Sequence, residues 1–567
     1  MNGGKLFLRS MEEAGVKVVF GVPGETSLPV YHELTDSSMS LRHVLMRDER
    51  NSAYAACGYA KASGGIGVVE SPSGGGALYV VPGLSEAYNS SIPLLSVTTD
   101  LPADQYETGS LTELNQRGLI SSVVKHLDYV TRTEHIPASV QRAMTIASSG
   151  RPGPSHLILP VNILEHEVSG TDELLATAHH VAFPYTEPRA DAGKINEAIG
   201  MIISAERPFI VAGGGVHLSG AYDSLKELAE LIIAPVGTTL TGKGTFPETN
   251  PLSVGVIGEN SSRKLANSLF RDADLVIFAG CKLGNVATFG WTLPDRKAKI
   301  IHIDVSAEWI GRNFPLNEKV LLLGDANSTL KAMVERLRAA LPTAASRSVH
   351  SDRVETIRRE TKDWWQSQED VVKVEGAVRP QVLFKIIRQL FKSKDVIISA
   401  DPGTSTPASA SLFPIDPAGR RYMILRSHGA LGNGLGMSIG AKIARPDKKV
   451  LFFTGDGSLG MSAGEIETTV RARAPLIMFL FQNSSFSWIK AHMRFLYDSM
   501  KFASLDFGSS DWVKIAEGHG AKGFTLTEDN IEKELKRTIK DDGTLFYAMN
   551  TVPLEEKPPL YWPWLTD

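Results

Sequence analysis

At residues 449–458 the chain reads Lys-Val-Leu-Phe-Phe-Thr-Gly-Asp-Gly-Ser, an apolar run that ends at an acid between two glycines. An apolar run of this length, closed by a turn, is typical of a strand buried on both faces of a parallel sheet. Glycines let the backbone come close to a ligand and point N–H groups at it. The turn therefore predicts a ligand-binding site at the end of a buried strand.

A second apolar strand is predicted at residues 476–481, after a helical stretch from Met461 to Arg473. It ends just before Asn483. Because neighbouring parallel strands end at the same edge of a sheet, Asp456 and Asn483 should come together where α/β sheets bind ligands. A carboxylate, an amide oxygen and a backbone carbonyl are hard donors that suit Mg²⁺, with diphosphate oxygens and water completing the octahedron. The spacing therefore predicts a site for a metal and a diphosphate.

The composition is that of an ordinary globular protein. The chain has 567 residues with 43% hydrophobic and 22% charged residues and a net charge of −4, which suits about three domains and no nucleic-acid partner. It contains no apolar run long enough for a membrane span and no signal peptide at its start. Cys57 and Cys281 are its two cysteines, so we expect no disulfide framework and a cytoplasmic location.

Strands alternate with helical patterns in three successive blocks, which predicts an α/β protein with three doubly wound parallel sheets. The blocks cover residues 1–170, 190–340 and 377–555. A polar, proline-containing linker separates the first two blocks, and a charged stretch separates the last two. The tail at 558–564 is rich in aromatic residues and proline, and we expect it to pack on the surface, with coverage of the active site as the alternative.

The 449–485 pattern resembles the thiamine diphosphate (ThDP) motif of the acetohydroxyacid synthase, pyruvate decarboxylase and pyruvate oxidase superfamily, which starts with Gly-Asp-Gly and closes with Asn-Asn. The resemblance implies a pyrimidine-binding, a central and a diphosphate-binding domain. It implies that Asp456 and Asn483 ligate Mg²⁺ through their side chains and Ser485 through its carbonyl. Gln482 replaces the first Asn of the pair. The residues expected beside the diphosphate in this turn are Gly455, Gly457 and Ser458.

Residues 47–60 resemble the family segment that carries an essential glutamate, and the match places this carboxylate at Glu49. In the family it protonates a ring nitrogen of the cofactor's aminopyrimidine, which then removes the C2 proton. A carboxyl group buried against an aromatic ring has a raised pKa and can share its proton with a ring nitrogen. The family takes this glutamate from a neighbouring subunit, which implies a homodimer or homotetramer with active sites between chains.

The same resemblance places further residues around the cofactor. The expected cofactor contacts are Ser73 and Gly75 in the 71–77 loop, Thr404 and Ser405 at the phosphates, and Gly429 at the pyrimidine. Leu431 aligns with the bulky residue that bends the cofactor so that its 4′-amino group reaches C2.

Four residues are predicted to face the substrate. Ile489 and His492 lie on a helix beside the cofactor. Glu25 is a candidate proton-transfer residue, or alternatively an acid favoured at a helix N-terminus. His428 is a candidate proton donor, with a loop histidine as the alternative.

In relatives the middle domain binds FAD, ADP or nothing. Glycine-rich turns after strands, at 213–215 and 280–284, suit a nucleotide pocket. However, a full Gly-x-Gly-x-x-Gly signature is missing, and Lys282 stands where FAD binders of the family have Arg. FAD, ADP or a CoA-type nucleotide therefore stays an open alternative but is not predicted, and an empty structural domain is the other alternative.

The expected activity is that of a ThDP- and Mg²⁺-dependent lyase or carboligase that acts on a 2-oxo acid or similar acyl donor. Acetohydroxyacid synthases have Gly, Phe-Gln and Lys where this chain has Glu25, Leu111-Thr112 and Val161, so its substrate should differ. The alternatives are a 2-hydroxyacyl-CoA lyase, a simple non-oxidative 2-oxo acid decarboxylase and a non-catalytic binding homologue. Retention of Glu49, Asp456 and Asn483 argues against the last.

Overall fold

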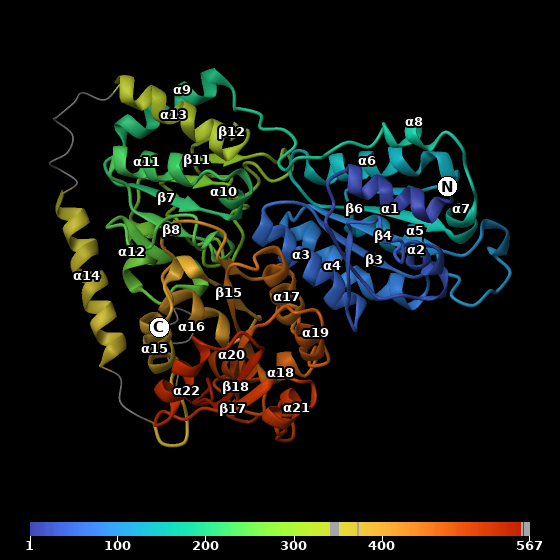
Figure 1. Cartoon of the computed structure of the whole chain (residues 1–567). Coiled ribbons are helices and arrows are strands. Elements are labelled where there is room, and N and C mark those ends of the chain that lie inside the picture. The colour runs from blue at the N-terminus through green and yellow to red at the C-terminus, as the bar shows by residue number, and fades with distance from the viewer. Residues whose placement is uncertain (341–350, 371–373, 557–559, 561–567) are drawn as a thin grey trace.

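The computed structural model describes residues 1–340, 351–370, 374–556 and 560. Within this part of the chain there are three six-stranded sheets, and the strands of each sheet pair in parallel (Figure 1). The predicted α/β class with three doubly wound parallel sheets is confirmed. The tail at 558–564, apart from Leu560, lies outside the described residues.

The first sheet has the strand order β2-β1-β3-β4-β6-β5. Its strands are β1 (Val18–Gly21), β2 (Arg42–Leu45), β3 (Gly67–Ser71), β4 (Leu94–Asp100), β5 (His126–Tyr129) and β6 (Pro154–Pro160). The helices of this block are α1 (Gly3–Glu13), α2 (Leu28–Glu33), α3 (Glu49–Ser63), α4 (Gly75–Ser90), α5 (Gln116–Ile120), α6 (Ile136–Ser148), α7 (Val161–Glu165) and α8 (Thr171–Leu175).

The second sheet has the order β12-β11-β10-β7-β8-β9. Its strands are β7 (Pro208–Ala212), β8 (Val236–Thr238), β9 (Ser253–Val256), β10 (Leu275–Ala279), β11 (Lys299–Asp304) and β12 (Lys319–Leu323). The accompanying helices are α9 (Ala192–Ser204), α10 (Gly214–Ser219), α11 (Tyr222–Ile232), α12 (Lys264–Arg271), α13 (Ala326–Ala340) and α14 (Ser351–Glu369).

The third sheet has the order β14-β13-β15-β16-β18-β17. Its strands are β13 (Val396–Ala400), β14 (Tyr422–Met423), β15 (Lys449–Gly455), β16 (Ile477–Gln482), β17 (Lys522–Thr525) and β18 (Leu545–Asn550). Its helices are α15 (Pro380–Leu390), α16 (Ser405–Leu412), α17 (Gly434–Ala444), α18 (Asp456–Leu459), α19 (Glu465–Arg471), α20 (Ser487–Tyr497), α21 (Trp512–Gly518) and α22 (Ile531–Thr538).

The two strands predicted around the Gly-Asp-Gly turn are β15 and β16, which pair in register from Leu451 with Ile477 to Gly455 with Phe481. The helix expected from Met461 to Arg473 is shorter, because α19 begins only at Glu465. Gly460 and Gly464 lower the helix propensity of the preceding stretch, which folds as turns.

The N-terminal and C-terminal blocks share one hydrophobic core, because α3 packs directly against α17 (Figure 1). The close crossing of α3 and α17 depends on glycine residues in both helices. A Cβ atom at Gly440 would lie 1.8 Å from the carbonyl oxygen of Ala55, and one at Gly58 would lie 2.0 Å from that of Met437. This close approach fixes the carboxyl edges of the first and third sheets relative to one another.

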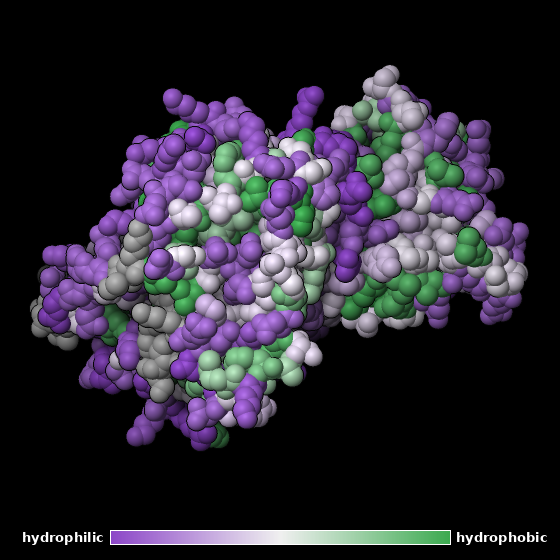
Figure 2. Space-filling model, turned by 90° about the horizontal axis from the view of Figure 1, so that it is seen from below, coloured by the Kyte–Doolittle hydropathy of each residue, from purple (hydrophilic) through white to green (hydrophobic). Residues whose placement is uncertain are grey.

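Apolar side chains also reach the surface. Figure 2 shows several apolar patches on one face of the molecule. The exposed large apolar residues of the N-terminal and C-terminal blocks include Leu28, Leu45, Leu78, Tyr79, Met461 and Val470. None of the helices in the described ranges has the length and apolar character needed to span a bilayer.

Candidate functional site

Asp456 lies at the end of β15 and is buried, with 3% of its surface exposed. Its Oδ2 atom accepts hydrogen bonds from the backbone N–H groups of Asn483 (2.9 Å) and Ser484 (2.6 Å). Its Oδ1 atom accepts one from Gly457 (2.9 Å). Burial raises the pKa of the Asp456 carboxyl, while these backbone donors favour its charged form. The structure thus brings Asp456 and the Asn483 loop together, as the strand pattern predicts.

The donor set at this edge suits a hard divalent cation. Asn483 Oδ1 accepts hydrogen bonds from the backbone N–H (3.1 Å) and the hydroxyl (3.3 Å) of Ser485, so the loop is a compact turn. No lysine, arginine or histidine among the described residues forms an ion pair with Asp456. A buried carboxylate without a cationic side-chain partner is costly unless another cation pairs with it. These residues therefore fit a Mg²⁺ ion.

A third loop reaches the same edge from β13. Ser405, the first residue of α16, donates its hydroxyl to the carbonyl of Asp401 (3.2 Å). Thr404 precedes it as the N-cap residue and makes no side-chain capping hydrogen bond. Ser458 donates its hydroxyl to the carbonyl of Pro402 (3.5 Å), which joins this loop to the Gly-Asp-Gly turn. The residues predicted at the diphosphate therefore gather at the carboxyl ends of β13, β15 and β16.

The glycine-rich stretch before α17 is held at its C-terminal end by Asp401. Gly429 and Gly432 have left-handed backbones, with φ of +65° and +80°, and the half-buried Leu431 lies between them. The Asp401 carboxylate accepts hydrogen bonds from the Gly434 N–H (2.7 Å) and the Thr454 hydroxyl (2.8 Å). Burial raises the pKa of Asp401 to about 6. This buried acid ties the stretch to the ends of β13 and β15.

Glu49 is half-buried at the start of α3, which Asp48 caps by accepting a hydrogen bond from the Arg50 N–H (2.7 Å). Burial is the main cause of the raised pKa of Glu49. The helix that follows is rich in alanine and ends at Gly64, whose φ is +74°. A Cβ atom at Gly76 would lie 2.6 Å from the Pro72 ring and 3.4 Å from Glu49 Oε1, so Gly76 lets Pro72 pack closely next to the carboxylate.

The other residues predicted in this block lie at the same edge. Ser73 is buried, and its hydroxyl accepts from Thr26 (3.1 Å) and donates to Thr112 (2.8 Å). Gly75 opens α4 and faces open space. Glu25 is exposed in the short turn after β1. Glu25, Glu49, Ser73 and Gly75 thus follow the carboxyl ends of β1, β2 and β3.

A buried polar cluster next to Glu49 escaped the sequence analysis. Tyr31 donates its hydroxyl to Glu70 Oε2 (2.8 Å), and its oxygen lies 3.0 Å from His43 Nε2. Glu70 is 2% exposed, and its Oε1 atom has no hydrogen-bond partner. Burial is the main cause that raises the pKa of Glu70 to about 8, and the charge of Glu49 contributes to this rise. The one signal of this cluster in the sequence is Glu70, an acid inside the apolar run 67–71.

Comparison with known proteins agrees with this arrangement. Three family models match successive parts of the chain: the N-terminal TPP binding domain of thiamine pyrophosphate enzymes at residues 1–119, the central domain at 195–333 and the C-terminal TPP binding domain at 401–548. This chain belongs to the thiamine pyrophosphate enzymes. Thiamine pyrophosphate is ThDP, and the enzyme is related to acetolactate synthases.

The similarity extends over more than nine-tenths of the length of these relatives. A probable acetolactate synthase large subunit of Methanocaldococcus jannaschii is 32% identical over 563 residues, which cover 98% of this chain and 93% of the relative. The acetolactate synthase isozyme 3 large subunit of Escherichia coli is 28% identical over 552 residues, which cover 95% of this chain and 92% of the relative.

Within this thiamine pyrophosphate enzyme, the residues predicted to face the substrate lie in different settings. Ile489 is 48% exposed on α20, and His492 lies one turn later with Nδ1 2.9 Å from the Trp488 carbonyl. His428 is exposed, but its Nε2 atom lies 2.7 Å from the Ser85 hydroxyl. The structure therefore ties His428 to α4, which suits the loop-histidine alternative. The proton-donor role stays a prediction.

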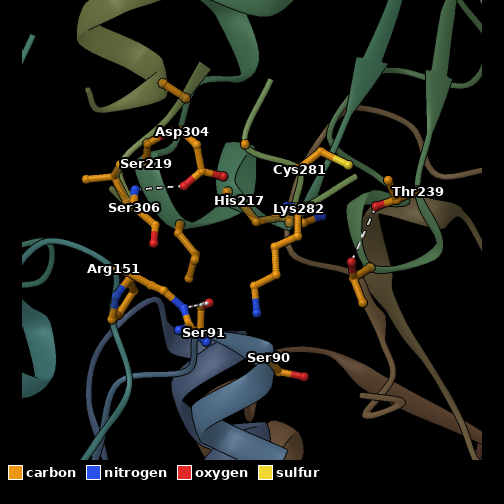
Figure 3. Close-up of a pocket in the computed structure, with 18 of the residues that line it drawn as sticks. Ser90, Ser91, Arg151, His217, Ser219, Thr239, Cys281, Lys282, Asp304 and Ser306 are labelled. Carbon is orange, nitrogen blue, oxygen red and sulfur yellow. Dashed lines mark hydrogen bonds between the residues drawn. The ribbon is translucent and has the colours of Figure 1, made fainter. Parts of the chain in front are cut away.

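A cavity of about 400 Å³ lies where the three blocks of the enzyme meet. Figure 3 shows Lys282 extending into it, with Arg151 and Asp304 among the surrounding side chains. Burial lowers the pKa of Lys282 to about 8. The C-terminal block contributes Arg420, Arg426 and Ser427 among other residues of the lining. The cavity thus has basic side chains and lies where the glycine-rich turns suggest a nucleotide pocket. Neither FAD nor ADP is predicted to occupy it.

Proposed function

We propose that this thiamine diphosphate enzyme uses Mg²⁺ and acts as a lyase or carboligase on a 2-oxo acid or a similar acyl donor. The observation that supports it most is the Asp456 site, where a buried carboxylate, without a cationic side-chain partner in the described part of the chain, lies against the Asn483 loop. Asp456, Asn483 and the Ser485 carbonyl would hold Mg²⁺, and the loops at Thr404 and Ser458 would hold the diphosphate. When bound, ThDP supplies an electron sink for breaking a bond at a carbonyl carbon.

Residues of the N-terminal block would carry out the proton transfers. Burial raises the pKa of Glu49, which keeps its carboxyl protonated to a higher pH and suits it to share a proton with a ring nitrogen. Glu25, on the exposed turn after β1, would exchange a proton at the substrate. Leu431 would contact the cofactor from the middle of the glycine-rich stretch, whose two ends are held by hydrogen bonds.

The substrate site should differ from that of acetolactate synthases, which the relatives are named for. Leu111 is 82% exposed, and Thr112 lies against Ser73. These two residues replace a Phe-Gln pair at the expected substrate side. A panel of 2-oxo acids, incubated with ThDP and Mg²⁺, tests this proposal when CO₂ and all aldehyde and acyloin products are followed by mass spectrometry. We expect product from at least one donor. No product from any member would refute a 2-oxo acid substrate.

A 2-hydroxyacyl-CoA lyase is the second candidate, and the cavity between the three blocks favours it. CoA carries phosphates, and Arg151, Lys282 and Arg426 line this cavity with basic side chains. A 2-hydroxyacyl-CoA belongs in the same panel, with release of the shortened aldehyde and formyl-CoA as the readout. Turnover of this compound alone would favour the second candidate over the first.

We also propose a homodimer or homotetramer with each active site between two chains. No hydrogen bond or ion pair among the described residues of one chain joins Glu49 to the Asp456 loops. The exposed apolar residues Leu28, Leu78, Tyr79 and Met461 offer surface for association.

Subunit complementation tests this arrangement. Glu49→Gln and Asp456→Ala chains would each be inactive alone. Dissociated and reassembled together, they should regain part of the wild-type activity, because one site of each mixed dimer takes both native residues. Absence of any recovery, with mixed dimers verified by native mass spectrometry, would contradict sites shared between chains.

A further inference from the structure

A buried carboxylate of the N-terminal block holds the start of the glycine-rich stretch. Glu86, on α4, is 1% exposed. Its Oε1 atom accepts a hydrogen bond from the backbone N–H of Ser427 (3.0 Å), and Oε2 accepts one from that of His428 (3.2 Å). The Ser90 hydroxyl donates to Oε1 at 2.6 Å. Three donors thus stabilise a buried charge that forms no ion pair among the described residues.

Side chains of the same helix face reinforce this contact. Ser90 Oγ lies 2.7 Å from Ser427 Oγ. His428 Nε2 lies 2.7 Å from Ser85 Oγ and 2.9 Å from Asn89 Nδ2. Residues 85, 86, 89 and 90 share one face of α4, since their spacing is that of successive helical turns.

The stretch is therefore fixed at both ends by buried acids. Glu86 holds its start from the N-terminal block, and Asp401 holds its end through the Gly434 N–H. Leu431 lies between these two anchors. Lys282 of the middle block also donates to the Asn89 carbonyl. The end of α4 thus contacts the middle and C-terminal blocks at the point where the expected cofactor contact begins.

We propose that Glu86 is a positioning residue, which sets the geometry of the 426–434 stretch and through it the place of Leu431 against the cofactor. This inference rests on the proposed function, because Leu431 matters only when ThDP is bound. Removing Glu86 leaves two backbone N–H groups without their acceptor, so the stretch loses its fixed start. A shift of about 1 Å in a positioning group can slow a reaction about a hundredfold without abolishing binding.

The test compares wild type with Glu86→Gln in three measurements: the melting temperature, the ThDP dissociation constant with Mg²⁺, and the rate at which the C2 proton of bound ThDP exchanges with deuterium. Glu86→Gln keeps the side-chain shape but can accept at only one atom. We expect ThDP binding to change less than about fivefold, while C2 exchange and kcat fall about tenfold to a hundredfold. Glu86→Asp, which keeps both acceptor oxygens, should restore part of the rate.

Glu528→Gln is the matched control. Glu528 is a buried carboxylate shortly before α22 that accepts hydrogen bonds from Arg379, the residue before α15. It should lower the melting temperature and leave C2 exchange at the wild-type rate. If Glu86→Gln does not fold, the double variant Ser90→Ala/His428→Ala removes the side-chain contacts without touching the charge, and it should slow C2 exchange by a smaller factor.

Wild-type C2 exchange in Glu86→Gln, or in the double variant, would overturn the positioning role even if the melting temperature falls. Absence of ThDP binding or of C2 exchange in the wild-type protein is a different result. It would overturn the proposed function, and this inference with it.

Discussion

The Oδ2 atom of Asp456 lies 2.9 Å from the backbone nitrogen of Asn483, across the ends of two neighbouring parallel strands. The register of β15 and β16 puts the two loops at one edge, and the carboxylate there lacks a cationic side-chain partner within the described ranges. The two residues would present a carboxylate and a side-chain amide oxygen to one ion.

Asp456→Ala should therefore lose the Mg²⁺ dependence of ThDP binding. Loss of a metal ligand costs more than the roughly 10- to 100-fold that loss of a supporting hydrogen bond costs. Calorimetric titration of ThDP, with Mg²⁺ and with EDTA, measures the effect. Tight binding that still requires Mg²⁺ in the variant would remove Asp456 from the metal site.

Glu70 should make the stability of the enzyme depend on pH. Its ordinary pKa of 4.5 applies to the unfolded chain, whereas burial raises it to about 8 in the folded protein. The folded state therefore binds more protons between these values, so the free energy of unfolding falls as pH rises from about 4.5 to about 8. Glu70→Gln removes this titration. The melting temperature of Glu70→Gln minus that of the wild type should therefore be more positive at pH 8 than at pH 5. An equal difference at both pH values would contradict the raised pKa.

Gly440→Ala should destabilise the junction of α3 and α17. The added methyl group would lie 1.8 Å from the Ala55 carbonyl oxygen, so a backbone must move, at a cost of about 1–3 kcal/mol. Gly200→Ala is the matched control, because that helical glycine has no neighbouring atom within 4 Å of the new Cβ. We expect the first variant to lower the melting temperature and the second to leave it unchanged or raise it. Equal melting temperatures for the two variants would contradict the close packing of the helices.

The sequence predicted the fold and the two halves of the candidate site because their signals are local. The apolar run before Asp456 defines a buried strand, and the position of Asn483 follows from the next strand in the chain. The resemblance at 47–60 then placed Glu49 at the start of a helix, where the structure has it.

Other features depend on partners that are distant in the chain. In the sequence Glu70 is an isolated acid within a predicted strand. The cluster cannot be recognised there, because Tyr31 and His43 come from other elements. Glu86 lies on a helix whose polar face looks solvated, yet its partner Ser427 is 341 residues away. A periodic pattern cannot reveal such contacts, since both partners are ordinary polar residues until the blocks pack together.

Deuterium exchange at C2 of bound ThDP in wild type and Glu49→Gln tests most directly whether this carboxyl activates the cofactor. The protein is loaded with ThDP and Mg²⁺, diluted into D₂O, quenched in acid and read by NMR. We expect rapid exchange in the wild type and a rate about 10²- to 10⁴-fold lower in Glu49→Gln, with the melting temperature and Mg²⁺-dependent ThDP binding retained. Equal exchange rates in the two proteins would contradict the role of Glu49.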